Sequence, residues 1–369
     1  MQEILKEFHS RPLSIEAAKR VREQAALFYS KFGRQPVLME VCGSHTMSLT
    51  RSGLKQALVD HVQLISGPGC PVCVTDQASI DGMIALANRE NTILCTFGDM
   101  MRVPGSSGSL LQAKTAGKDI RIVYSPLDSL TVARQHPDKE VVFLGIGFET
   151  TIPILALLLQ QAEEQNMANF SIWTATKLVE PIIRHLLDSG EVQVDGFLLP
   201  GHVSIVLGEE NYTFLREAYS KPGVITGFEP VEMAMGIYRL LSMLVSGEAA
   251  VGNEYKSVVG KKGNSAARQL MEAYFVPDAE AWRGIGLLPD SGLRIRDEYA
   301  EFDAKKKWGV AIPPPRKTKC RCGDIIRGLI APPACPLYGK ACTPMNPIGP
   351  CMVSGEGTCA AYYQYIREE

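Results

Sequence analysis

The spacing of apolar residues predicts one long helix near the start of the chain, followed by a repeated strand, loop and helix rhythm. Residues 13–32 have the helical spacing of an amphipathic helix, which we expect to end before Gly33 and Pro36. Short apolar runs separated by helical segments follow, at 37–41, 62–65, 92–97 and 120–124. Strands that alternate with helices in this way are typical of a parallel sheet with crossover helices.

The same rhythm runs a second time in the middle of the chain. Its predicted strands lie at 141–146, 171–175, 196–199 and 224–226. Beyond residue 250 the pattern weakens, and we expect one helix over 266–274 and then an irregular stretch through residue 303. We therefore predict an α/β fold with two parallel-sheet domains that face a cleft. The predicted ranges are a helical extension over 1–35, a first α/β domain over 36–138, a second over 139–285, and a small cysteine-rich domain over 286–369.

Composition narrows the class of protein. A length of 369 residues suits two or three domains, and a net charge of -2 gives no electrostatic reason to expect nucleic acid or an anionic membrane as a partner. Residues 1–11 lack the apolar core of a signal peptide, and the longest apolar stretch, 152–159, is far shorter than the roughly 20 residues of a membrane helix. We therefore expect a cytoplasmic protein, where clustered cysteines more often serve metal or redox chemistry than structural disulfides.

Six of the ten cysteines lie in the last fifty residues, among prolines and glycines and with little helical or strand periodicity. They are Cys320, Cys322, Cys335, Cys342, Cys351 and Cys359. Thiolates on a metal centre would hold such a segment where packing cannot. The segment lacks the paired Cys-x-x-Cys knuckles of a zinc ribbon, so an iron-sulfur cluster fits it better than zinc. The spacing does not choose four ligands out of six.

Other distinctive residues follow the carboxyl ends of predicted strands. These loops are Cys42-Gly43-Ser44-His45-Thr46, Gly67-Pro68-Gly69-Cys70-Pro71-Val72-Cys73, the loop 98–105, the segment 147–151, Pro200-Gly201-His202 and the segment 227–230. In open parallel sheets such strand ends converge on one crevice, where these folds bind ligands. Two facing sheets would line a cleft with thiols, imidazoles and carboxylates.

Cys70 and Cys73 have the Cys-x-x-Cys spacing of a reversible disulfide or of half a metal site. We expect a helix from about Asp76 to lower the pKa of these thiols through its dipole. Cys42 and His45 could reach one metal ion from a single strand-to-helix turn, or could be an isolated thiol and a hydrogen-bonded imidazole. Cys95 lies inside an apolar run and is expected to be a core residue.

Three further polar residues are candidates for binding a cofactor in the predicted cleft. His202 could act as an acid, a base or a hydrogen-bond donor in the cleft, or could cap a helix. Glu149 and Glu229 belong to two copies of Gly-Phe-Glu, each directly after a predicted strand and before a helix. Their carboxylates could serve the cleft or act as ordinary helix caps.

Several of these motifs together resemble the HypD family of maturation factors for nickel-iron hydrogenases. The resemblance rests on residues 42–46, 67–73 and 147–151 and on Gly349-Pro350-Cys351-Met352-Val353-Ser354, and it spans nearly the whole chain. It implies two Rossmann-like domains and a C-terminal domain with a [4Fe-4S] cluster. It also implies that Cys320, Cys335, Cys342 and Cys359 hold the cluster, with Cys322 and Cys351 as a redox dithiol beside it.

The resemblance also implies a function. Members of the family are thought to assemble the Fe(CN)2CO group of the hydrogenase together with a HypC-type chaperone, and to receive cyanide from HypE, which acts with HypF. The iron would bind at Cys42, with His45, Cys70 and Cys73 around it; Met47 stands where some relatives have a second histidine. We therefore expect a redox-active assembly scaffold rather than a free-standing enzyme. The alternatives are a stand-alone iron-sulfur thiol-disulfide oxidoreductase and a zinc-containing binding protein.

Overall fold

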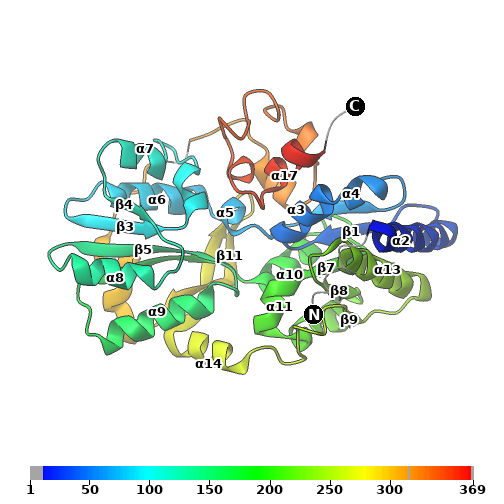
Figure 1. Ribbon diagram of the computed structural model, residues 1–369, viewed down its shortest axis with the longest axis horizontal. Helices are drawn as coiled ribbons and strands as arrows, with labels where there is room; N and C mark the ends of the chain where they lie inside the picture. Colours follow the sequence, from blue (N-terminus) through cyan, green and yellow to red (C-terminus); the bar gives the residue numbers. More distant parts are fainter. Residues whose placement is uncertain (1–10, 315, 367–369) are drawn as a thin grey trace.

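The computed structural model describes residues 11–314 and 316–366, and it consists of two α/β lobes joined by a cysteine-rich cap. Lobe 1 is built on a five-stranded parallel sheet and lobe 2 on a four-stranded parallel sheet. The two lobes lie side by side, and the C-terminal segment covers the junction between them on one face (Figure 1).

The sheet of lobe 1 has the strand order β2-β1-β7-β8-β9. Its strands are β1 (Val37–Glu40), β2 (Gln63–Ser66), β7 (Gly196–Pro200), β8 (Gly223–Thr226) and β9 (Val251–Asn253). Helix α2 (Arg11–Phe32) packs against α13 (Pro230–Ser246) on the outside of this sheet. The predicted amphipathic helix over 13–32 is therefore present, and its buried face contains Val21, Ala25 and Phe28.

The sheet of lobe 2 has the order β4-β3-β5-β6. Its strands are β3 (Thr92–Thr96), β4 (Ile120–Ile122), β5 (Glu140–Gly147) and β6 (Phe170–Thr176). The strands β3, β5 and β6 are buried along nearly their whole length, as expected when helices cover both faces of a parallel sheet. The lobe's helices are α6 (Gln77–Ala87), α7 (Leu110–Thr115), α8 (Asp128–Gln135) and α9 (Ile152–Glu164).

The chain passes between the lobes more than once, and this differs from the predicted division at residues 138 and 139. β1 and β2 belong to lobe 1, the next four strands build lobe 2, and β7, β8 and β9 return to lobe 1. Leu38 in β1 is thereby paired with Gly196 in β7. All eight predicted strands exist, but apolar spacing along the chain carries no information about which strands become neighbours.

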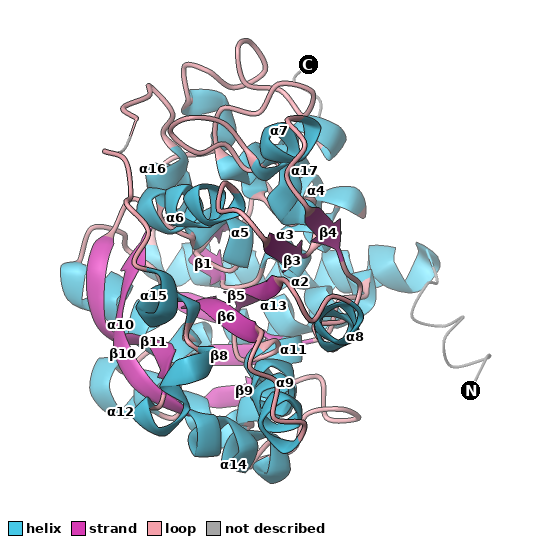
Figure 2. Cartoon of the chain, turned by 90° about the vertical axis from the view of Figure 1, so that its left-hand side faces the viewer, coloured by secondary structure: helices cyan, strands magenta, loops and turns pink. Residues whose placement is uncertain are grey.

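The stretch predicted to be irregular up to residue 303 is instead a long antiparallel ribbon. It is formed by β10 (Phe275–Trp282) and β11 (Gly286–Ile295), so the predicted boundary at residues 285 and 286 separates two paired strands. The ribbon follows α14 (Ser265–Tyr274), which agrees with the predicted helix over 266–274. It docks on the edge of lobe 2, where Thr176 Oγ1 accepts a hydrogen bond from Leu293 N at 3.0 Å. Figure 2 shows this ribbon curving along one side of the molecule.

The remaining segments connect and cover the lobes. Helix α10 (Val179–Ser189) leads from lobe 2 back to lobe 1, where α11 (Gly201–Leu207) and α12 (Phe214–Tyr219) follow. The cap contains α16 (Cys322–Ile326), the short helices η4 (Pro332–Ala334) and η5 (Pro350–Met352), and α17 (Thr358–Tyr365). Lys55 forms a buried ion pair with Glu40 inside lobe 1. The ring of Tyr362, whose centroid lies 5.3 Å from Lys55 Nζ, fastens α17 to this lobe. No helix within the described ranges has the length and apolar character to cross a membrane.

Candidate functional site

Two glycine-containing loops meet at the edge of lobe 1 that faces the cap. Cys42 follows β1 and precedes α3 (Gly43–Arg51), and Cys70 follows β2 and precedes α5 (Pro71–Val74). Because β1 and β2 are parallel neighbours, both loops leave the sheet at the same edge. A Cβ atom on Gly69 would lie 2.4 Å from Cys42 Cα, closer than any real contact. Glycine therefore lets the two loops touch at this point.

The cap supplies a third wall around Cys42. A Cβ atom on Gly43 would lie 2.7 Å from the main-chain oxygen of Glu356, so the cap backbone packs directly on the loop. Ser44 Oγ donates a hydrogen bond to Glu356 Oε1 at 2.5 Å. Ser44 stands in the loop singled out from the sequence but was given no role there, and Glu356 was not predicted. The available signal was weak: one carboxylate set between Gly355 and Gly357 in a cysteine-rich segment.

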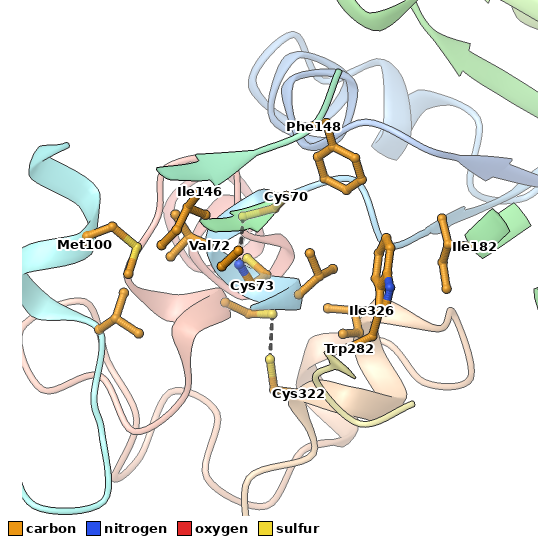
Figure 3. Packing of buried hydrophobic residues seen from close by; sticks show 14 of the residues in the cluster. Cys70, Val72, Cys73, Met100, Ile146, Phe148, Ile182, Trp282, Cys322 and Ile326 are labelled. Atoms are coloured by element: carbon orange, nitrogen blue, oxygen red, sulfur yellow. Dashed lines mark hydrogen bonds between the residues drawn. The ribbon is translucent and has the colours of Figure 1, made fainter. Parts of the chain in front are cut away.

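A row of cysteine sulfur atoms connects the edge of lobe 1 at Cys42, called the Cys42 rim below, to the cap. Cys70 Sγ accepts a hydrogen bond from Cys73 N at 3.3 Å, and the Cys73 side chain is hydrogen bonded to those of Cys70 and Cys351. Cys351 Sγ lies 2.8 Å from Cys322 Sγ, compared with about 2.05 Å in a disulfide. Figure 3 shows Cys70, Cys73 and Cys322 following one another through this packed region. Four thiols from two distant parts of the chain are therefore in contact.

These thiols lie in an apolar interior. Cys70 is 5% exposed and Cys73 is 1% exposed, in a buried cluster that includes Phe148 and Trp282. Burial raises the pKa of Cys73 well above its ordinary value. The prediction that a helix dipole lowers this pKa is therefore wrong for Cys73, because removal from water outweighs it. Burial also raises the pKa of Cys42 to about 11, although the backbone of His45 and Ser44 donates to that thiol.

His45 is buried beside the Cys42 loop in a defined tautomer. Its Nε2 lies 3.2 Å from the carbonyl oxygen of Thr226, which can only accept, so Nε2 carries the proton. Burial lowers the pKa of His45 to about 4, and the ring is neutral at physiological pH. The other nitrogen, Nδ1, is buried and has no hydrogen-bond partner. A neutral imidazole that donates one N–H to a carbonyl and keeps the other nitrogen free is the form in which histidine binds metals.

His202 and Glu229 lie farther along the same edge of lobe 1. The exposed ring of His202 stacks on Phe228 with 4.0 Å between ring centroids, and the ring of His45 lies 4.9 Å from Phe228. Partial removal of the imidazole from water lowers the pKa of His202. Glu229 is the N-cap of α13 and forms a capping box with Glu232, so the capping role that its position allowed is present.

Glu149 is directed toward a different helix. Its Oε1 accepts a hydrogen bond from Val179 N, at the start of α10, with a distance of 2.9 Å. The side chain is 3% exposed, and burial raises its pKa to about 7. Glu149 thus caps α10 and not α9, the helix that its own motif precedes.

All six cysteines of the cap line one small apolar cavity, together with residues such as Ile325, Tyr338 and Met352. Cys342 Sγ accepts a hydrogen bond from Ile348 N at 3.3 Å, and Cys320 and Cys359 lie close enough to interact with it electrostatically. A donor set of cysteines alone, in an apolar shell with a backbone N–H directed at sulfur, suits an iron-sulfur cluster. Cys351 contacts both Cys322 and Cys359 and so joins this cavity to the Cys73 thiol.

In the part of the chain that the structure describes, no three His, Cys, Asp or Glu side chains are grouped so that they could hold one metal ion. The ligands of a cubane bind four different iron atoms, so they are not expected to converge on a single point. Cys95 lies apart from both groups of sulfurs, in the fully buried strand β3. Burial raises its pKa to about 12.

Comparisons with known proteins identify the family of the chain. The family model HypD, described as the hydrogenase formation hypA family, matches residues 16–366. The hydrogenase maturation factor HypD of Rhodobacter capsulatus is 47% identical over 334 residues, which cover 89% of each chain. The proteins of the same description from Escherichia coli (strain K12) and Cupriavidus necator are 40% and 43% identical, and the matches cover 96% or more of each chain. The chain belongs to the HypD family of hydrogenase maturation factors.

Proposed function

We propose that this protein is the scaffold on which the Fe(CN)2CO group of a nickel-iron hydrogenase is assembled, and that it supplies the electrons for this assembly from its own sulfur atoms. The observation that carries the proposal is the unbroken contact from Cys70 and Cys73 through Cys351 to Cys322. It links the Cys42 rim, where iron would be handled, with the cysteine cavity of the cap.

The iron is the cargo, and Cys42 is its proposed ligand. Cyanide and carbon monoxide bind best to a soft, electron-rich iron, which thiolate ligation favours. Cys42 is partly exposed whereas Cys70 and Cys73 are buried, so it is the thiol of this group that an incoming iron and a docking partner can reach. The free Nδ1 of His45 offers a second donor from the same turn.

The cap would hold the resident cofactor. Cys320, Cys335, Cys342 and Cys359 would bind a [4Fe-4S] cluster, which supplies one electron at a time to the neighbouring thiols. Cys322 and Cys351 are then left as a dithiol pair. Two electrons and two protons convert a disulfide between them to two thiols, and exchange through Cys73 passes this reduction to the Cys70–Cys73 pair.

The buried position of the Cys-x-x-Cys pair argues against the alternative of a general thiol-disulfide oxidoreductase. Such an enzyme must present an attacking thiol to a disulfide on another protein. Cys70 and Cys73 are 5% and 1% exposed, so their exchange partner is within the chain. The proposed partners are a HypC-type chaperone at the Cys42 rim and HypE, acting with HypF, as the donor of cyanide.

The proposal can be tested with three variants purified anaerobically together with a HypC-type partner. Cys42→Ala should lose the bound iron and the infrared bands of cyanide and carbonyl. Cys351→Ser should keep the visible absorption and acid-labile sulfide of the cluster but lose the infrared bands, since the sulfur contact is broken. Cys95→Ala, which removes a buried cysteine far from both groups, is the matched control and should behave as the unaltered protein.

Two results would contradict the proposal. Retention of iron with cyanide and carbonyl bands in Cys42→Ala would remove the assigned ligand. Zinc without acid-labile sulfide in the unaltered protein would remove the electron source.

A further inference from the structure

A wide basic cleft opens on the cap beside the cysteine cavity. It encloses about 1160 Å³ and is lined by the loop that carries Ser106 and Gly108, by the turn between β10 and β11, and by the segment that leads into the cap. Five cationic residues line it: Arg102, Arg283, Arg316, Lys317 and Lys319. Among the residues that the structure describes, no aspartate or glutamate lines it. In a protein with a net charge of -2, this is a marked local excess of positive charge.

These cations are not neutralised by the protein itself. Among the described residues, none of the five forms an ion pair with a carboxylate. Arg102 donates to the carbonyl of Pro344, and Arg283 donates to the carbonyl of Thr75 and to Gln77 Oε1. Four of the five, all except Arg283, are exposed. Their positive field therefore extends into solvent.

The cleft reaches the cysteine cavity at one point. Cys320 and Cys322 line both the cleft and the cavity. Of the six cysteines in the cap, Cys320 is the one that is partly exposed, and the other five are buried. Cys322, by contrast, leads inward to Cys351 and Cys73. The side of the cavity at Cys320 is thus its open side, and the opposite side faces the Cys42 rim.

We infer that this cleft is the docking site of an acidic one-electron donor protein, which reduces the cap through the side at Cys320. The inference rests on the proposed redox function. It adds the external partner that supplies the electrons and the direction of their flow, from the side at Cys320 toward the Cys42 rim. In each encounter the docked donor would be oxidised by one electron, which the cluster that the cap cysteines would hold beside Cys320 would accept. Two encounters supply the two electrons that, with two protons from solvent, convert one disulfide of the row of sulfur atoms to two thiols.

The arrangement of the charges favours a protein over a small phosphate compound. A phosphate site gathers donors around one anion, often with a bidentate arginine. Here Arg316, Lys317 and Lys319 extend from one exposed segment along the wall of the cleft, while Arg283 uses its guanidinium to hold Thr75 and Gln77. Separated charges in solvent steer a large partner of opposite charge into register.

The test uses the double variant Lys317→Glu with Lys319→Glu and, as probe, a chemically reduced plant-type [2Fe-2S] ferredoxin. Stopped-flow absorbance measures the second-order rate constant for oxidation of the ferredoxin, and calorimetry measures binding of the oxidised ferredoxin. We expect the rate constant and the affinity to fall about tenfold or more at low ionic strength. The difference should largely disappear at about 1 M salt, where the Debye length is about 3 Å. Dithionite should reduce the variant as fast as the unaltered protein.

The matched control is Lys256→Glu with Lys262→Glu. It changes the net charge by the same amount at two exposed lysines between β9 and α14, on the side of the molecule away from the cap (Figure 1). An equal loss in this control would overturn the inference, as would an unchanged rate in the cleft variant. Binding of ATP that depends on Lys317 and Lys319, with ferredoxin unaffected, would also overturn it and assign the cleft to polyphosphates. Calorimetry measures docking of the ferredoxin whether or not a cluster is present. Absence of acid-labile sulfide from the unaltered protein would therefore refute the proposed function without deciding whether the ferredoxin docks in the cleft.

Discussion

One methyl group added at Gly69 should separate the loop that carries Cys42 from the loop that carries Cys70. In Gly69→Ala the new Cβ would lie 2.4 Å from Cys42 Cα and 2.5 Å from Cys42 N. Carbon atoms pack best at about 3.5 Å or more, so the loops must move apart by about 1 Å. Because both close atoms belong to the backbone, no side-chain rotation can relieve the contact. Overpacking of this kind costs about 1–3 kcal/mol of folding free energy.

The expected effect on function is larger than the effect on stability. Displacement of a reacting group by about 1 Å can reduce a rate about 100-fold. Gly69→Ala should therefore remain folded, with a lower midpoint in urea unfolding, but should carry far less iron with cyanide and carbonyl bands after purification with a HypC-type partner. Iron analysis and infrared spectroscopy of the same sample give both values.

Gly355→Ala is the matched control. Gly355 lies next to Glu356, near the same loop, but a Cβ atom there would have no heavy atom within 4 Å. This variant should retain both stability and the infrared bands. If Gly69→Ala retained the bands as well, contact between the Cys42 and Cys70 loops would not be needed for assembly. The two loops would then not act as one site.

Two further predictions concern buried charges. Burial raises the pKa of Glu149 from 4.5 to about 7. Between these pH values the folded state binds more protons than the unfolded state, so the free energy of unfolding should fall by about 3 kcal/mol as pH rises through this window. Glu149→Gln should remove that decline in urea unfolding measured from pH 4.5 to pH 8, and an unchanged slope would contradict the assignment. Lys55→Met should cost about 3–5 kcal/mol because it leaves the fully buried Glu40 without its partner, whereas Lys55→Met with Glu40→Leu should regain most of this. A loss below about 1 kcal/mol in the single variant would show that the Lys55 ammonium does not compensate Glu40.

Except for β9, the strands of both sheets could be predicted, because their apolar runs are largely buried. The run at 141–146, for example, corresponds to β5, whose residues are almost all inaccessible to solvent. Burial on both faces of a parallel strand produces a continuous apolar signal that can be read locally. The position of the loops after β1 and β2 at one edge of the sheet could also be predicted, since these strands are adjacent both in sequence and in the sheet.

The pairing of β1 with β7 could not be predicted in this way. Nothing in residues 37–40 or 196–200 specifies the other strand, because backbone hydrogen bonds are the same for any partner. The ribbon of β10 and β11 was missed for a different reason. Pro277 and Asp278 in β10, and Pro289 and Asp290 in β11, are typical of turns, yet they are tolerated here because much of the ribbon is exposed.

The interwoven path of the chain has a consequence for the order in which the protein can become functional during synthesis. Lobe 1 cannot complete its sheet until β9 has left the ribosome, and the loop after Cys42 meets Glu356, through Gly43 and Ser44, only when residue 356 has been translated. A nascent chain therefore exposes Cys42 without the walls that later surround it. If Cys42 holds iron as proposed, stable loading would be restricted to chains in which the cap has folded onto lobe 1.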